Sequence, residues 1–510
     1  MMINPATRVH DKPKHVPLGI LQLISILRRD YPQIGVELYD DNAYRDDQQL
    51  TEALQEQYDV VAVGGLITAY SRIKKIVNDA KQYSPDCKVV VGGGFFTSMP
   101  EEMMRWIPEV DYGVVGEAYV SLPNLLNCIH INGDVSQVKG LVYRDGATYR
   151  QTSLQPLIPD LDWLPYPAYD YAPLDIYFKN SSILMSKESM NSKRRLDCCF
   201  SLGCIFTCRM CWDLGITSNT VKNGRPGKHT LHRHHSPKYV AEIIQYLYEK
   251  YQVDQISWLD ENIVVHDAKT NFTWLKEIER ELEARGLLPE QLGSKAVFHG
   301  GTSHAGLIKR ETLRTMKRIG FTYLDLGLES FSPLILKDLG KGSTPEKNKE
   351  AVRMTLEEGI TPIPNMIVGF PDETWESINL MLDAWEETGI VSKPFICSAY
   401  PGSEWFSEYR ERILQQYNGD LEQFILDLGD ATKVTALLTD RFTPVEMVGI
   451  QNVLAESAKS QNFENARRLF ALSKKSSSLF FISSCHPKPP LRVLLAIFFH
   501  LLSFVYIVKR

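Results

Sequence analysis

Short apolar runs alternate with segments of helical spacing through most of the chain. In the first third, the runs typical of buried strands are 36–39, 58–63, 87–91 and 111–115. Residues 71–83 and 101–106 carry apolar side chains at the three- and four-residue intervals of an amphipathic helix. Strands that are apolar throughout and alternate with helices predict a parallel, doubly wound Rossmann-like sheet that is covered on both faces.

The same alternation returns in the middle of the chain. The strands expected there are 255–259, 296–299, 323–328, 361–368 and 394–399. About six βα units of this length predict a full or partial parallel (β/α) barrel of the TIM type, with its chemistry at the carboxyl ends of the strands. Residues 410–470 have helical spacing with one polar face. The fold class is therefore α/β with a helical C-terminal region.

These patterns divide the chain into five expected segments. They are a Rossmann-like domain (1–135), a proline-rich and aromatic linker (136–190), a barrel (191–405), a helical region (406–475) and a hydrophobic tail (476–510). Within the tail, residues 493–508 are nearly all apolar. A helix of that length is about 24 Å long, short of the ~30 Å hydrocarbon core of a bilayer. This length favours an interfacial or docked helix over a membrane span.

Glycines follow three of the four predicted front strands. They are Gly64 and Gly65, then Gly92, Gly93 and Gly94, and finally Gly116. Glycine at the carboxyl end of a strand allows a ligand to approach the backbone closely, which predicts a ligand-binding edge on this sheet. The alternative is that the glycines only form tight turns. No G-x-G-x-x-G fingerprint is present, so NAD is not the expected ligand.

Charge and cysteine usage limit the function classes. The chain has 510 residues and a formal net charge of −6, which gives no reason to expect nucleic-acid binding. Five of its nine cysteines lie between residues 198 and 211. Clustered cysteines in a long chain without an apolar leader indicate a metal site in a reducing compartment, so we expect a cytoplasmic protein.

Three of these cysteines form a C-x3-C-x2-C motif, Cys204, Cys208 and Cys211. Three soft thiolates in one short loop suit an iron–sulfur cluster and leave one iron free to bind a small molecule. Zinc is an alternative, with a fourth ligand from a nearby histidine. Those histidines are His229, His232, His234 and His235. A closed site completed by Cys198 or Cys199, and unpaired reduced cysteines, are further alternatives.

The motif resembles that of the radical S-adenosylmethionine superfamily. The resemblance implies a [4Fe-4S] cluster that chelates S-adenosylmethionine through its open iron and generates a 5′-deoxyadenosyl radical. Cys204, Cys208 and Cys211 then bind the cluster. Met210 stands where the family usually has an aromatic residue, and Trp212 is the candidate for the missing adenine contact.

Segments further along the chain match the family in the same order. Asp260 and Glu261 resemble the acidic motif after the second barrel strand, where a carboxylate pairs with the ammonium group of the cofactor. Glu329, in the sequence LGLES, resembles the glutamate that reaches the ribose or the substrate. Gly369, in IVGFPDET, lies in the segment that resembles the adenine-binding turn.

The first domain resembles the cobalamin-binding branch of this superfamily. The resemblance is carried by PLGI at Pro17, GGGFFTSMPEE at Gly92 and YGVVGEAY at Tyr112, the last of which adds Glu117 to the candidate corrinoid contacts. The D-x-H-x-x-G motif that supplies an axial histidine elsewhere is missing, so a bound cobalamin is expected to lack a histidine ligand from the protein.

The resemblance implies a cobalamin-dependent radical methyltransferase that acts on an unactivated carbon. A radical rearrangement, cyclisation or oxidation without cobalamin is one alternative, and a zinc-stabilised, non-enzymatic interaction protein is another. The expected partners are a small-molecule substrate and a one-electron reductant such as flavodoxin or ferredoxin. A hydrophobic substrate would suit a tail that faces a membrane. Membrane association is expected to involve the tail.

Overall fold

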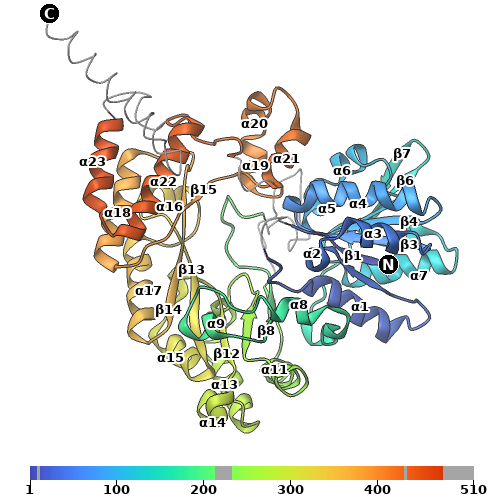
Figure 1. The fold of residues 1–510 in the computed structure, drawn as a ribbon, viewed down its shortest axis with the longest axis horizontal. Coiled ribbons are helices and arrows are strands. Elements are labelled where there is room, and N and C mark those ends of the chain that lie inside the picture. The colour runs from blue at the N-terminus through green and yellow to red at the C-terminus, as the bar shows by residue number, and fades with distance from the viewer. Residues whose placement is uncertain (8–11, 213–231, 430–433, 475–510) are drawn as a thin grey trace, which may run out of the picture.

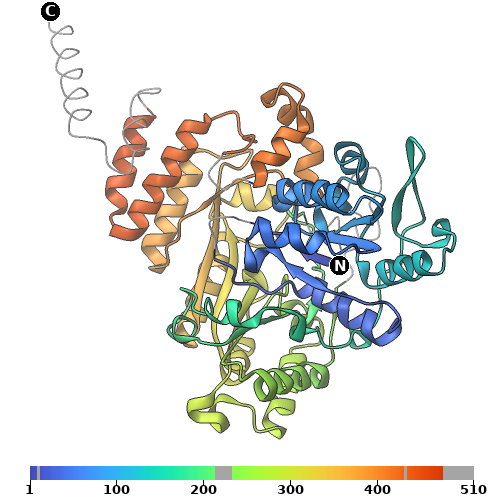
Figure 2. The ribbon, with the colours of Figure 1, turned by 45° about the vertical axis from the view of Figure 1, so that its right-hand side comes forward.

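Two β-sheets organise the chain. The structure is a computed structural model, and it describes residues 1–7, 12–212, 232–429 and 434–474. A seven-stranded sheet from the first third of the chain, the front sheet, lies beside a six-stranded sheet from the middle, the barrel sheet (Figure 1). Helices cover both sheets, and the turned view in Figure 2 shows the same side-by-side arrangement.

The front sheet has the strand order β2-β1-β3-β4-β5-β6-β7. Its strands are β1 (Met2–Asn4), β2 (Leu38–Asp40), β3 (Val60–Gly64), β4 (Lys88–Gly92), β5 (Tyr112–Val114), β6 (Leu141–Asp145) and β7 (Thr148–Gln151). The first five are parallel, and β6 and β7 are antiparallel. The order reverses between β1 and β3, which is where doubly wound sheets bind ligands beyond their carboxyl ends.

Helices cover both faces of the front sheet. They are α1 (Leu18–Asp30), α2 (Asp41–Tyr44), α3 (Asp47–Leu54), α4 (Tyr70–Tyr83), α5 (Gly94–Ser98), α6 (Pro100–Trp106) and α7 (Ala118–His130). Strand β4 shows why two layers form: Val89 and Val91 pack into one core with α3, α4 and α6, whereas Val90 packs into another with α1 and α7. The continuous apolar runs of the sequence are therefore strands buried on both faces.

The front sheet extends beyond the expected domain boundary at residue 135. The hairpin β6–β7 was expected in the linker 136–190, but it pairs with β5 and belongs to the sheet. Its outer strand β7 is exposed along its whole length. Its sequence therefore lacks the apolar positions by which a buried strand is predicted. The linker proper then carries two 3-10 turns, Leu161–Trp163 and Tyr169–Tyr171, and the short helices α8 (Leu174–Phe178) and α9 (Lys187–Asn191).

The barrel sheet has the order β15-β14-β13-β12-β11-β8, and all neighbouring strands are parallel. Its strands are β8 (Arg195–Cys198), β11 (Gln255–Trp258), β12 (Phe298–His304), β13 (Phe321–Glu329), β14 (Thr361–Val368) and β15 (Phe395–Ile396). The two ends of this order do not pair, so the sheet is a partial barrel. The sequence did not single out β8, because Arg195 and Asp197 interrupt its apolar pattern.

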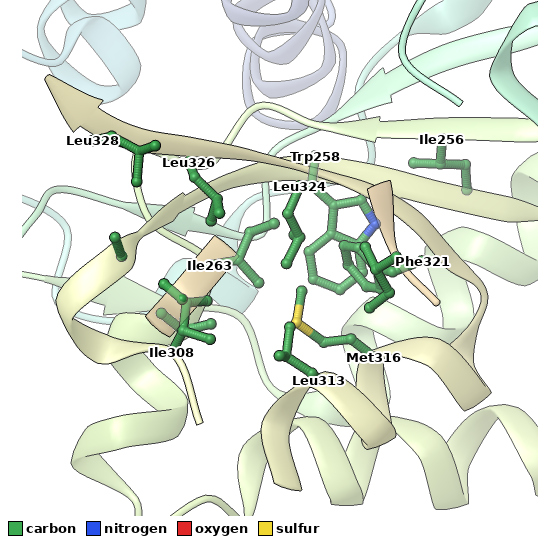
Figure 3. Packing of buried hydrophobic residues seen from close by; sticks show 14 of the residues in the cluster. Ile256, Trp258, Ile263, Ile308, Leu313, Met316, Phe321, Leu324, Leu326 and Leu328 are labelled. Carbon is green, nitrogen blue, oxygen red and sulfur yellow. The ribbon is translucent and has the colours of Figure 1, made fainter. Parts of the chain in front are cut away.

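Helices line the outer face of the barrel sheet. They are α11 (Pro237–Tyr251), α12 (Val264–Lys269), α13 (Trp274–Ala284), α14 (Pro289–Leu292), α15 (Arg310–Ile319), α17 (Pro345–Glu357) and α18 (Trp375–Thr388). Helix α16 (Pro333–Asp338) follows β13, and its Ile335 packs into the core shared with the front sheet. Figure 3 shows Trp258, Leu324 and Leu326 on the sheet face that meets Leu313 and Met316 of α15. Because side chains alternate along a strand, the residues between them point to the concave face, which we call the barrel interior.

The helical C-terminal region packs on both halves of the molecule. Its helices are α19 (Glu404–Glu408), α20 (Arg410–Gln416), α21 (Leu421–Gly429), α22 (Pro444–Ser460) and α23 (Phe463–Ser473). Phe406, Phe424 and Ile425 share one hydrophobic core with front-sheet residues such as Val61. By contrast, α23 packs against α18 of the barrel (Figure 1). The two sheets are thus held together by a common core.

The described residues contain no helix that is both long and apolar enough to cross a bilayer. The apolar segment 493–508, on which the membrane expectation depended, lies outside the described residues.

Candidate radical and corrinoid site

The cysteine loop follows the short strand β9 (Ser201–Leu202), which pairs with β10 (Arg233–His234). Arg209 anchors the loop: its backbone N–H donates to the Leu339 carbonyl at 3.0 Å, and its carbonyl accepts from the Trp405 N–H at 3.1 Å. The guanidinium forms ion pairs with three carboxylates, those of Asp338, Glu404 and Glu408. The Phe206 ring stacks on His304 with centroids 3.9 Å apart. The loop is therefore fixed on both sides of Cys208.

The surroundings of the cysteines suit thiolate ligands. Cys208 is buried, Cys204 and Cys211 are partly buried, and none is in a disulfide. Burial raises the pKa of Cys208 to about 11, and Lys341 opposes this effect. Burial also raises the pKa of Cys204, against a hydrogen bond from the backbone amide of Phe206. A nearby ammonium group and an amide donor stabilise the negative charge that cysteine sulfurs carry on a cluster. Three sulfur donors in this setting fit an iron–sulfur cluster.

Two of the histidines proposed for zinc, His234 and His235, are engaged with other residues, whereas both ring nitrogens of the buried His232 lack a hydrogen-bond partner among the described residues. His234 stacks on His266 with ring centroids 3.1 Å apart, and His235 hydrogen-bonds to Asp162 at 3.0 Å. His229 lies outside the described residues. In the part of the chain that the structure describes, no three His, Cys, Asp or Glu side chains converge as ligands of a single metal ion do.

Glu329 ends strand β13 in an unusual backbone conformation. Its φ is +61°, in the left-handed region, and the pairing of β13 with β14 shifts register beside it. The carboxylate accepts a hydrogen bond from Lys341 Nζ at 2.8 Å, and both side chains are buried. A Cβ on Gly327 would lie 2.8 Å from Glu329 Oε1 and 2.9 Å from Lys341 Nζ. The glycine thus makes room for a buried ion pair that faces the cysteine loop.

Two of the predicted carboxylates lie side by side but face different groups. Asp260 is buried and accepts hydrogen bonds from the Ser201 hydroxyl at 2.6 Å and the Phe200 N–H at 3.2 Å. It therefore positions the strand before the cysteine loop, and burial raises its pKa to about 6. Glu261 instead lines a cavity between the two sheets. Of the pair, Glu261 is the one placed to reach a ligand.

The turn at Gly369 is built around a buried glutamate. Gly369 has φ +86°, and its N–H donates to Glu373 Oε2 at 2.9 Å. The Ser377 hydroxyl also donates to Glu373. Burial raises the pKa of Glu373 to about 7. Glu373 thus stabilises the turn at the end of β14. Met210, from the cysteine loop, packs into the core shared with the front sheet.

All the predicted front-sheet glycines line one cavity. Its volume is about 550 Å³, and it also reaches Trp212, Leu259 and Glu261 on the barrel side. The glycines that line it are Gly64, Gly65, Gly92, Gly93, Gly94 and Gly116, followed by Glu117. Gly93 has φ +88°, and a Cβ there would lie 2.7 Å from the Gly65 carbonyl oxygen. The glycines therefore keep two neighbouring strand ends close together and the edge of the sheet bare.

The cavity continues as an apolar slot between the sheet and its helices. Ala62, Val90 and Val114 line it from the sheet, and Leu23 and Leu122 from α1 and α7. At its mouth, Leu66 and Leu259 expose 45% and 41% of their surfaces. Exposed apolar side chains on both walls of a cavity, with a bare backbone edge, fit a large flat ligand such as a corrinoid.

Two basic residues of the site did not stand out in the sequence. Arg233 is buried and holds Glu117 in an ion pair, with Nη1 2.9 Å from Oε2. Lys341 pairs with Glu329, as described above. The glycines on either side of Lys341 could have indicated that this segment closely approaches another part of the chain. In the structure, Gly340 packs beside Thr207 and Gly342 beside Phe206, so the segment contacts the cysteine loop.

Comparison with known proteins agrees with this arrangement. A family model described as the radical SAM superfamily matches residues 199–384, and one described as a B12 binding domain matches residues 7–126. A protein of Pyrococcus horikoshii named as an uncharacterised methyltransferase is 25% identical over 76% of this chain and 77% of its own length. The anaerobic magnesium-protoporphyrin IX monomethyl ester cyclase of Cereibacter sphaeroides is 26% identical over 72% of this chain, but the match covers 56% of that protein.

Solved structures share the fold. TsrM from Kitasatospora setae, a radical S-adenosylmethionine methyltransferase, aligns with a TM-score of 0.64 at 18% identity, over 81% of this chain and 76% of its own. OxsB, a cobalamin-dependent S-adenosylmethionine radical enzyme, aligns with a TM-score of 0.66 at 15% identity, over 98% of this chain and 75% of its own.

A partial barrel that carries a three-cysteine loop beside a doubly wound sheet defines a class of two-cofactor radical enzymes. The chain belongs to the radical S-adenosylmethionine superfamily, in the branch that carries an amino-terminal cobalamin-binding domain. The expected fold and the expected cofactors, a [4Fe-4S] cluster, S-adenosylmethionine and cobalamin, are confirmed. The protein is an enzyme, so the non-enzymatic zinc alternative is set aside.

The Lys341–Glu329 pair generates a stability prediction for the apoprotein. Lys341→Met leaves the Glu329 carboxylate buried without its cation, which costs about 3–5 kcal/mol. The double variant Lys341→Met/Glu329→Gln removes both charges and recovers most of that loss. Denaturant unfolding of the two variants measures the effect. Equal losses in the single and double variants would contradict it.

Glu373 generates a pH prediction. Its pKa in the folded chain is about 7, above the usual 4.5, so the folded state keeps a proton that the unfolded chain releases. The apoprotein therefore loses stability as pH rises from about 4.5 to 7, on the order of 3 kcal/mol. Glu373→Gln lacks this titration. The melting temperature of the variant minus that of the wild type should rise between pH 5 and pH 8; a constant difference would refute the assignment.

Proposed function

We propose that this enzyme methylates an unactivated carbon of a small organic substrate in a cobalamin-dependent radical reaction. One observation carries the proposal: a single cavity is lined by the glycine edge of the front sheet and by Trp212, Leu259 and Glu261 of the barrel. Ligands held by the two sheets would therefore meet in one space. The methyltransferase names of the Pyrococcus horikoshii relative and of TsrM support the same reaction class.

When bound, the cluster and S-adenosylmethionine supply a 5′-deoxyadenosyl radical, and the corrinoid supplies a methyl group. Cys204, Cys208 and Cys211 would hold the cluster, and the cationic Lys341 beside them offsets the charge of the thiolates. Burial lowers the pKa of Lys341, but Glu329 and Cys208 raise it above its usual value, so the ammonium group stays charged.

The residues of the barrel would orient S-adenosylmethionine. Glu261 is placed to accept hydrogen bonds from its ammonium group, and Glu329, fixed by Lys341, is placed for its ribose or for the substrate. Trp212 lies at the cavity wall and Gly369 at the end of β14. Asp260 acts indirectly, because it fixes Phe200 and Ser201 in the segment before the cysteine loop.

The residues of the front sheet would bind the corrinoid without a coordinating side chain. The bare edge at Gly64, Gly92 and Gly116 allows a flat ring to contact the backbone. Apolar side chains on both walls exclude water from the shared space, which protects a radical from quenching. Among the described residues that line this cavity there is no histidine.

A second candidate is an oxidative radical cyclisation. The magnesium-protoporphyrin IX monomethyl ester cyclase relatives favour it, since they match more than two thirds of this chain. The two reactions differ in the fate of the methyl group of S-adenosylmethionine. Anaerobic incubation of the holoenzyme with S-adenosylmethionine that carries a deuterated methyl group separates them: methyl transfer predicts labelled methylcobalamin on the enzyme, whereas cyclisation leaves the corrinoid unlabelled.

The cluster assignment predicts a difference between neighbouring cysteines. Cys208→Ala should lower 5′-deoxyadenosine formation to background and remove the iron–sulfur absorption of the anaerobically reconstituted protein, because one of three cluster ligands is lost. Cys199→Ala is the matched control, and it should retain both. Cluster loss in Cys199→Ala would instead favour the closed site with a fourth cysteine.

The corrinoid assignment predicts that a large side chain at the glycine edge prevents corrinoid binding and leaves cluster assembly unaffected. Gly64→Leu places a side chain in the cavity and should reduce bound corrinoid at least tenfold, with the iron content unchanged. Gly35→Leu is the control, because a Cβ at Gly35 has no atom within 4 Å. The measurement is corrinoid and iron per chain after reconstitution. Full corrinoid binding by Gly64→Leu would rule out this edge as the site.

A further inference from the structure

Asp325 lies on the inner face of the barrel, in the middle of strand β13. Its neighbours Leu324 and Leu326 point outward to the helices (Figure 3). Asp325 therefore points into the barrel interior with Tyr323 and Gly327. Its partners in register are Thr302 on β12 and Ile363 on β14. All three side chains are partly buried, so this level of the barrel interior is accessible to a small ligand.

The strand register places Asp325 between the two cofactor regions. Trp258 pairs with Gly301, so the next residue, Leu259, lies level with Thr302 and Asp325. Leu259 lines the corrinoid cavity, and two strand spacings separate it from Asp325, about 10 Å. Along its own strand, Asp325 is two residues, about 7 Å, from Gly327. Gly327 in turn contacts the Glu329–Lys341 pair.

The cations near Asp325 in the described structure are already paired. Arg195 pairs with Asp197 at 3.4 Å, and Asp197 also accepts hydrogen bonds from His15 Nδ1 at 3.1 Å and the Val16 N–H at 3.0 Å. Lys341 pairs with Glu329. No described residue donates a hydrogen bond to Asp325 or forms an ion pair with it. Burial alone raises its pKa, to about 6, so at neutral pH it is an ionised carboxylate without a partner.

The other enclosed aspartates among the described residues contrast with Asp325. The buried ones, Asp40, Asp41, Asp197, Asp260 and Asp267, all accept hydrogen bonds from nearby residues. A desolvated carboxylate without such partners destabilises a fold, which is why structural carboxylates are paired. Asp325 therefore has the character of a binding group whose partner arrives with a ligand.

We propose that Asp325 recognises a positively charged nitrogen of the substrate and anchors that end of it in the barrel. The proposal rests on the proposed function, because it assumes that the substrate occupies the space between the cofactors. A cation is favoured over a neutral hydrogen-bond donor, because an enclosed carboxylate requires a countercharge as well as a hydrogen bond. The substrate is then an amine or a similar base whose apolar part extends toward Leu259.

The test uses the full-length holoenzyme and simple probes. Binding of n-butylammonium and of its uncharged analogue 1-butanol is measured by calorimetry for the wild type, Asp325→Asn and Glu376→Gln. Glu376 is the control, because it is an acidic residue of helix α18, outside the barrel interior. We expect the ammonium probe to bind Asp325→Asn at least tenfold more weakly and Glu376→Gln as tightly as the wild type. If the ammonium probe binds the wild type and Asp325→Asn equally tightly, the proposal is overturned. It is also overturned if Asp325→Asn weakens the binding of 1-butanol as much as that of the ammonium probe.

The pH dependence and stability of the same variant give an independent readout. The titratable group shown to interact with Asp325 is Tyr323, which also lies near Arg195 and Asp197. Asp197 in turn pairs with His15, and the Glu329–Lys341 pair lies beside Gly327 of the same strand. Wild-type affinity for the ammonium probe should rise from pH 5 to pH 7, and Asp325→Asn should lack that rise. Asp325→Asn should melt at a higher temperature than the wild type at pH 8, and by a smaller margin at pH 5, because the folded wild type then keeps a proton on Asp325. A lower melting temperature at pH 8 would show a structural partner and contradict the proposal.

Failure of this proposal is distinguishable from failure of the proposed function. Formation of 5′-deoxyadenosine and of labelled methylcobalamin needs no substrate amine, so both should persist in Asp325→Asn. Equal binding of the ammonium probe to the wild type and Asp325→Asn, with both reactions intact, refutes the role of Asp325 alone. Absence of both reactions in the wild type refutes the proposed function.

Discussion

The chemistry of this chain depends on two parallel sheets that present the carboxyl ends of their strands to one cavity. Parallel strands place all their outgoing loops at one edge, so each sheet gathers its ligand-binding residues there. The two edges are held against one another by a hydrophobic core that contains both Val61 of the front sheet and Phe424 of helix α21. A second link is polar: Asp197 of β8 accepts hydrogen bonds from His15 and Val16, which belong to the first domain.

Within that frame, buried charges set the geometry of the site. Burial alone would raise the pKa of Asp197, but His15 and Arg195 hold it below its usual range, so an ionised carboxylate accepts the hydrogen bonds that link the domains. The Glu329–Lys341 pair lies beside the cysteine loop and is made possible by the missing side chain of Gly327. Arg233 fixes Glu117 at the opposite wall. Desolvated pairs of this kind add little stability but fix side-chain positions where water would otherwise randomise them.

Much of the fold could be predicted from periodicity, and the missing parts have physical reasons. Apolar runs gave β3, β4, β11 and β14, because strands buried on both faces are continuously hydrophobic. Strand β8 was not recognised, since Arg195 and Asp197 face a polar interior. Cysteine spacing predicted the loop that would hold the cluster, and the assignment of its three cysteines stays a prediction. Lys341 and Arg233 were not predicted, because a buried lysine or arginine is identified by its partner in space. Asp325 was not predicted either, since an inward aspartate within a strand has no sequence signature of its own.

The central claim is that the corrinoid and the iron–sulfur cluster face one another across a single cavity. Electron paramagnetic resonance tests it directly on reconstituted holoenzyme that contains cob(II)alamin. If the two cofactors share the cavity, reduction of the [4Fe-4S] cluster should shorten the spin relaxation of the cobalt centre and broaden its spectrum. A cobalt signal that is the same with the oxidised and the reduced cluster would contradict the account.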